Sequence, residues 1–184
     1  MIHRLAIIIP AYKATFLPAV LNSIAAQSCK DFTLYVGDDC SPEPISDIVE
    51  QYRDKIELVY QRFETNLGGK DLVAQWERCI AMSQDEPYIW LFSDDDVMEA
   101  NCVEELFRQI ENTKGVYNLY HFNVDVIDER GAFKNYYGYG RYGKYGRYGY
   151  SKYGYSRYGY GNYGSYGNYA NSHYGNKDDN SIKK

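Results

Sequence analysis

The sequence lacks any long hydrophobic run. Its first apolar stretch, residues 5–9, stops at Pro10, whereas a membrane-spanning helix needs about 20 apolar residues. The same stretch is shorter than the apolar region of a secretory signal peptide, which has about 7–15 residues. We therefore expect a cytoplasmic protein, either free or in peripheral contact with the inner face of the membrane.

Several motifs for binding and redox chemistry are also missing. The four cysteines form no C-x-x-C pair and the three histidines are isolated, so we expect neither a disulfide framework nor a zinc site. No G-x-G-x-x-G follows the first apolar run, and no G-x-x-x-x-G-K-S/T occurs. These absences disfavour a Rossmann dehydrogenase and a P-loop kinase. A phosphotransfer receiver is disfavoured because its paired acids would stand where Pro10-Ala11-Tyr12 stands.

Proline and aliphatic side chains are scarce in the C-terminal part. All five prolines precede residue 88, and 15 of the 22 tyrosines follow residue 135. Residues 1–135 carry 12 Lys and Arg against 23 Asp and Glu, a net charge of −11. Residues 136–184 carry 8 against 2, a net charge of +6. We predict a folded domain over residues 1–134 and a disordered, basic, Tyr/Gly-rich tail over residues 135–184.

Apolar residues in the first part predict alternating strands and helices. Continuous β-branched runs indicate buried strands, and apolar residues at helical spacing indicate amphipathic helices. This alternation predicts an α/β fold, with a mostly parallel sheet and helices on both faces. The expected strands cover residues 5–9, 32–37, 56–61, 88–92 and 116–124, and the expected helices cover residues 16–27, 45–52, 72–80 and 103–110.

Polar residues follow three of these strands directly. Tyr12 follows the first strand, Asp38-Asp39 the second, and Ser93–Asp96 the fourth. Parallel sheets bind ligands beyond the carboxyl ends of their strands, so we expect these side chains at one edge. Alone, Tyr12 is typical of a loop aromatic and Asp38-Asp39 of a turn or a helix N-cap. Three consecutive aspartates repel one another, and a cation would compensate for that repulsion.

A nucleotide sugar suits such an edge chemically. Tyr12 can stack on the base, and Asp39 can accept a hydrogen bond from a base N–H. The diphosphate is negative, so a hard divalent cation, Mg²⁺ or Mn²⁺, must bridge it to the carboxylates. The residues therefore predict metal-assisted binding of a nucleoside diphosphate.

The motifs resemble those of the family-2 glycosyltransferases of the GT-A fold over residues 5–128. The matching segments are Ile8-Ile9-Pro10-Ala11-Tyr12, Val36-Gly37-Asp38-Asp39-Cys40-Ser41, Asn66-Leu67-Gly68-Gly69 and Phe92-Ser93-Asp94-Asp95-Asp96. By this resemblance, Pro10, Tyr12 and Asp39 line the base site. The metal motif of the family is Asp-x-Asp-Asp, and here Ser93 replaces its first acid. The resemblance then implies Asp95 as the first metal ligand, Asp96 as the second, and Asp94 as a nucleotide contact.

The resemblance implies an enzyme of surface polysaccharide biosynthesis. It would transfer a sugar, with inversion, from a UDP-sugar or another nucleotide-diphosphate sugar to a saccharide or lipid-linked acceptor. The general base of the family lies far beyond the metal motif, and here that distance runs past residue 184. We interpret Asp125 and Asp128 as residues of a strand end and a turn rather than as this base. The alternative is a module that binds a nucleotide sugar without turning it over.

The tail has a resemblance of its own. Its tyrosine clusters are similar to the C-terminal tails of bacterial polysaccharide-assembly tyrosine kinases, which implies a tyrosine kinase or an assembly complex as partner. Phosphorylation would turn the basic tail acidic. Alternating Tyr and Arg can also bind nucleic acid, but the −11 charge of residues 1–135 disfavours that partner. A change of reading frame near residues 133–136 is an alternative origin of the tail.

Overall fold

The computed structural model describes residues 2–132. The chain divides into two compact units, Met1–Tyr117 and Asn118–Lys184. The predicted boundary near residue 134 and the predicted disordered tail lie outside the described residues, so both stay predictions. The functional positions expected from the sequence all fall in the first unit.

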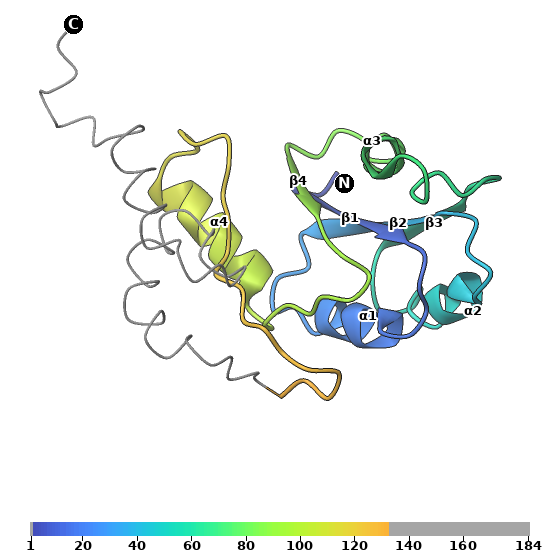
Figure 1. The fold of residues 1–184 in the computed structure, drawn as a ribbon. Helices are drawn as coiled ribbons and strands as arrows, with labels where there is room; N and C mark the ends of the chain where they lie inside the picture. The colour runs from blue at the N-terminus through green and yellow to red at the C-terminus, as the bar shows by residue number, and fades with distance from the viewer. Residues whose placement is uncertain (1, 133–184) are drawn as a thin grey trace, which may run out of the picture. The chain divides into compact units, whose positions relative to one another are not determined.

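A four-stranded parallel sheet forms the centre of this first unit (Figure 1). Its strands stand in the order β3-β2-β1-β4. Ala11 at the end of β1 lies opposite Asp38 at the end of β2, and Ile8 lies opposite Leu91 of β4. The strand bounds are Leu5–Ala11 for β1, Phe32–Asp38 for β2, Leu58–Arg62 for β3 and Tyr88–Leu91 for β4.

The helices α1, α2 and α3 cover both faces of the sheet. In Figure 1, α1 and α2 lie on one face and α3 on the other. Crossovers of one hand produce this arrangement, because the chain runs from β1 to β3 in one direction and then returns across the sheet to β4. The helix bounds are Leu17–Ala25 for α1, Ile45–Glu50 for α2, Leu72–Ile80 for α3 and Cys102–Asn112 for α4. Within residues 2–132, none of these helices has the length and apolar character to pass through a bilayer.

The sheet and helices confirm the predicted α/β class, and burial explains why. Every residue of β2 is buried, and β1 is buried except at Pro10. Strands buried on both faces require continuous apolar runs, which is the pattern that the sequence has there. Local signals set the helix starts: Pro18 stands in the first turn of α1, and Asp71 caps α3 by accepting the Ala74 N–H at 2.9 Å.

The strand predicted over residues 116–124 is wrong. Residues 116–126 have no regular secondary structure. Their apolar side chains are largely exposed, with Val116 at 69%, Leu119 at 82% and Val124 at 56%. Strand-forming side chains favour an extended backbone, but a strand also needs a neighbour that accepts and donates backbone hydrogen bonds. Within residues 2–132, the sheet ends at β3 on one edge and at β4 on the other, and this segment pairs with neither.

Gly37 in β2 is required by the close approach of α3. A Cβ atom on Gly37 would collide with Sγ of Cys79 and lie 3.0 Å from the ring of Phe63. We expect Gly37→Ala to lower the free energy of unfolding by about 1–3 kcal/mol, as overpacking does in well-packed cores. Urea denaturation measures the loss. Adding Cys79→Ala should recover part of it, and strictly additive losses in the double variant would contradict this explanation.

Candidate functional site

The candidate site lies at the carboxyl edge of the sheet, between β1 and β4. The strand order reverses there, since β2 and β3 lie on one side of β1 and β4 lies on the other. Ligands of open parallel sheets bind at such a switch point, beyond the ends of the strands. The segments that follow β1, β2 and β4 carry the residues predicted from the sequence.

The loop after β1 is bound to the acid run after β4. Oδ2 of Asp94 accepts the backbone N–H groups of Tyr12 at 2.8 Å and Lys13 at 2.9 Å. The Tyr12 side chain is 42% exposed, so its ring has surface available for stacking. Pro10 lies in β1 opposite Gly37. The structure thus brings Tyr12 and Asp94 together.

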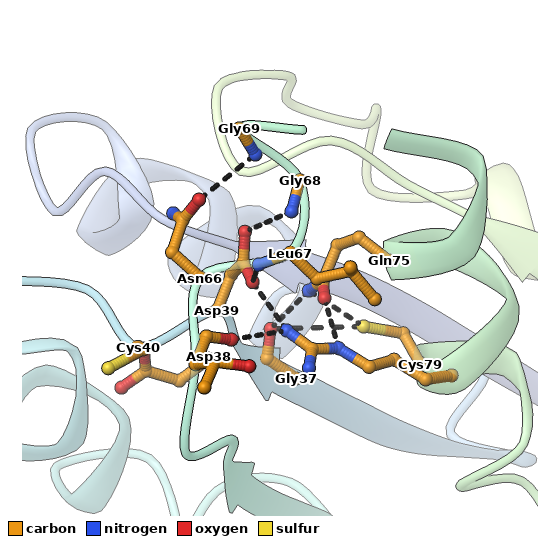
Figure 2. Close-up of polar contacts among 12 residues, drawn as sticks. Gly37, Asp38, Asp39, Cys40, Asn66, Leu67, Gly68, Gly69, Gln75 and Cys79 are labelled. Atoms are coloured by element: carbon orange, nitrogen blue, oxygen red, sulfur yellow. Dashed lines mark hydrogen bonds and ion pairs between the residues drawn. The ribbon is translucent and has the colours of Figure 1, made fainter. Parts of the chain in front are cut away.

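The carboxylate of Asp39 holds the loop before α3 (Figure 2). Asp39 is 3% exposed. Its Oδ1 accepts the Leu67 N–H at 2.7 Å and pairs with Arg78, and its Oδ2 accepts the Gly68 N–H at 2.8 Å. A carboxylate has about four acceptor positions, and three donors inside the protein use most of them. The predicted contact of Asp39 with a base stays a prediction and would use the remaining position.

The contact of Asp39 with the loop before α3 explains the Asn-x-Gly-Gly motif in physical terms. Oδ1 of Asn66 accepts the Gly69 N–H at 3.0 Å, which forms a tight turn. A Cβ atom on Gly68 would lie 2.8 Å from Oδ2 of Asp39, and one on Gly69 would lie 2.5 Å from Oδ1 of Asn66. Glycine at these positions lets an acceptor oxygen approach the backbone closely, and at Gly68 that oxygen belongs to the buried Asp39 carboxylate.

Arg78 of α3 is a residue that the sequence interpretation missed. Its guanidinium pairs with Asp39, lies 3.9 Å from the ring centre of Phe63, and donates to the Thr65 carbonyl at 3.0 Å. It also donates to Oε1 of Gln75 at 2.5 Å, and Figure 2 shows Gln75 beside Gly37. The sequence signal was the spacing of Gln75, Arg78 and Cys79, which puts two polar residues on a helix face that turns toward the sheet.

Asp38 has a different role from Asp39. It is fully buried, and its Oδ1 accepts the Ser41 N–H at 2.8 Å. Its Oδ2 accepts from the Tyr60 hydroxyl at 2.7 Å and pairs with Arg62 at 2.8 Å. Burial and the Asp38 carboxylate together raise the pKa of Tyr60 to about 12. Asp38 therefore joins the ends of β2 and β3 and does not reach the exposed edge.

The acid run presents two exposed carboxylates, Asp95 and Asp96. The Ser93 hydroxyl donates to Oδ1 of Asp95. The pKa of Asp96 is raised, because its carboxylate is partly desolvated and lies near the charges of Asp95 and Asp94. Two carboxylates that repel each other suit a hard cation, since Mg²⁺ commonly takes one or two carboxylates and completes its shell with substrate phosphates. Within residues 2–132, no group of three or more His, Cys, Asp or Glu side chains is arranged to hold a metal ion.

The model of glycosyl transferase family 2 matches residues 6–164. The poly(ribitol-phosphate) beta-N-acetylglucosaminyltransferase TarS of Staphylococcus aureus is 35% identical over 96 residues, covering 50% of this chain and 16% of TarS. An uncharacterized glycosyltransferase of Haemophilus influenzae is 29% identical over 119 residues, covering 64% of this chain and 38% of the relative. The chain therefore spans well under half the length of these relatives.

Solved structures of TarS share the fold. The crystal structure of TarS 1-349 in complex with UDP matches with a TM-score of 0.55 and 27% identity, covering 59% of this chain and 32% of that structure. The complex with UDP-GlcNAc matches with the same TM-score and identity, covering 59% of this chain and 31% of that structure. The GT-A arrangement that the sequence implied is confirmed for the matched part of the chain.

Arg78→Ala tests the contact that joins β2 to α3. The change leaves the buried Asp39 carboxylate without its cation, and we expect a loss of about 3 kcal/mol in the free energy of unfolding. Adding Asp39→Asn removes the uncompensated charge and should recover part of the loss. Urea denaturation of the single and double variants measures both effects.

The matched control is Arg53→Ala, which breaks an exposed pair with Glu50. It should cost no more than about 1 kcal/mol, as exposed pairs do. If Arg78→Ala costs no more than Arg53→Ala, the Asp39–Arg78 pair does not stabilise this edge.

Proposed function

The chain belongs to glycosyl transferase family 2, and we propose that its carboxyl sheet edge binds the nucleotide-diphosphate sugar of a glycosyl transfer reaction. The observation that carries this proposal is the pair of hydrogen bonds from the backbone of Tyr12 and Lys13 to Asp94. They join the end of β1 to the acid run at the switch point of the sheet. A partly exposed aromatic ring and two exposed carboxylates then belong to one connected edge.

The proposed roles follow the chemistry of each side chain. Pro10 and Tyr12 contact the base, with Tyr12 stacking on it, and Asp39 offers the base its remaining acceptor position. Asp94 turns its second oxygen to the ribose. Asp95 and Asp96 hold Mg²⁺ or Mn²⁺ against the diphosphate, and the cation, when bound, stabilises the charge of the departing nucleoside diphosphate.

A UDP-sugar is the donor we propose. TarS structures with UDP and UDP-GlcNAc support this choice, because they share the fold and 27% of the aligned residues. We propose a saccharide or lipid-linked acceptor, transfer with inversion, and a place in surface polysaccharide biosynthesis at the cytoplasmic face of the membrane. These finer points rest on family membership.

A non-catalytic nucleotide-sugar-binding module is the second candidate. Asp128 favours it, since its Oδ1 accepts the N–H groups of Arg130 and Ala132, both at 2.9 Å. The turn predicted at residues 128–131 is thereby confirmed, and this acid is used inside that turn. We expect a tyrosine kinase or an assembly complex to bind the tail, and the residues of the tail lie outside the described range.

Asp95→Asn tests metal-assisted donor binding. UDP with Mn²⁺ at about 100 times the dissociation constant should stabilise the unaltered chain by about 2.7 kcal/mol. A rise in melting temperature reports this gain. Asp95→Asn should abolish the rise, because the neutral amide removes one of the two negative charges proposed to hold the cation. Asp85→Asn, which neutralises an exposed acid before β4, should retain it. If no nucleoside diphosphate raises the melting temperature, donor binding is refuted.

Turnover separates the two candidate functions. We expect the 184-residue chain with UDP-GlcNAc, Mn²⁺ and saccharide or lipid-linked acceptors to release UDP and to form a glycosylated product. Mass spectrometry of the acceptor and a UDP assay measure both. Binding of UDP-GlcNAc without either product would assign the module function instead.

A further inference from the structure

The loop after β1 is held by carboxylates on two sides. Its three successive backbone N–H groups, at Tyr12, Lys13 and Ala14, all donate to acidic side chains. Asp94 accepts the first two, and Oε2 of Glu43 accepts the third at 2.6 Å. The strand β1 ends at Ala11, so the backbone N–H groups that follow it need acceptors other than a neighbouring strand, and these side chains supply them.

Ser41 completes the connection between the loop after β2 and the loop after β1. Its hydroxyl donates to the Tyr12 carbonyl at 2.5 Å and accepts the Glu43 N–H at 3.0 Å. Ser41 is buried and Glu43 is half-buried. Glu43 thus receives a fixed position from Ser41 and contacts the backbone two residues beyond Tyr12.

We infer that Glu43 is a positioning residue for donor binding, an inference that rests on the proposed function. Its carboxylate acts through the backbone of residues 12–14 and sets where the Tyr12 ring stands relative to Asp94 and Asp95. Asp94 restrains this loop from the β4 side, and Glu43 restrains it from the β2 side. Binding of a base against Tyr12 is then favoured, because the loop is already ordered and loses less conformational freedom.

The role of Glu43 needs an acceptor oxygen rather than a negative charge. A glutamine at this position keeps an oxygen that can accept the Ala14 N–H, whereas an alanine removes it. Asp54 supplies the matched control, because it is an exposed acid after α2 and Asp54→Ala removes the same charge. The three variants therefore separate the acceptor from the charge.

Two measurements on the full 184-residue chain test this inference. Hydrogen exchange of the peptide that contains Ala14, without nucleotide, should be faster by about tenfold or more in Glu43→Ala. Titration calorimetry with UDP and Mn²⁺ should show affinity weakened by about tenfold in the same variant, the effect expected for losing one hydrogen bond. Glu43→Gln and Asp54→Ala should stay within about threefold of the unaltered chain in both measurements. The remaining binding by Glu43→Ala should still require Mn²⁺.

Each contrary outcome refutes a distinct claim. Unchanged exchange at Ala14 in Glu43→Ala overturns the loop contact itself. Faster exchange with unchanged UDP affinity overturns the positioning role, as does a Glu43→Gln variant as weak as Glu43→Ala. If Glu43→Ala does not fold, the comparison of Glu43→Gln with Asp54→Ala decides the question. Equal losses of UDP affinity in these two variants would assign the effect to the negative charge and overturn the positioning role. Failure of the unaltered chain to bind UDP overturns the proposed function, and the positioning role with it.

Discussion

Backbone N–H groups at the carboxyl edge of the sheet need acceptors, and this chain supplies carboxylates for them. Asp38 accepts the N–H of Ser41, Asp39 those of Leu67 and Gly68, Asp94 those of Tyr12 and Lys13, and Glu43 that of Ala14. Hydrogen bonds to ionised acceptors are short and strong. These four acids therefore fix the loops of this edge, whereas Asp95 and Asp96 in the acid run after β4 are exposed.

The sequence could predict β1 and β2, because short continuous apolar runs indicate strands buried on both faces. It could also predict that Tyr12, Asp39 and Asp94 would gather, since all follow strands of one parallel sheet. It could not predict which acids accept backbone N–H groups, because that depends on the direction of each side chain at its strand end. Asp38 and Asp39 are neighbours in sequence, yet Asp38 pairs with Arg62 of β3 and Asp39 with Arg78 of α3.

The sequence did not predict the roles of Glu43 and Arg78, and the reasons are related. Each looks like an ordinary charged residue, one after a proline and one near the end of a helix. Their partners are 29 and 39 positions away along the chain, so no local pattern indicates which residues they contact. The wrong prediction of a strand over residues 116–124 has the opposite cause. Its local pattern was strong, but strand formation depends on a neighbouring strand that local pattern does not report.

Ser93 shows how a departure from the family motif fits this edge. The resemblance expects an acid at this position. Partial burial and the charges of Asp95 and Asp94 already raise the pKa of Asp96, and a fourth carboxylate beside these three would add to the repulsion. A serine replaces that repulsion with a hydrogen bond, because its hydroxyl donates to Oδ1 of Asp95. The bond restrains the rotamers of Asp95. Serine at position 93 thus replaces a negative charge with a hydrogen bond that orients Asp95. By the resemblance, Asp95 is the first metal ligand.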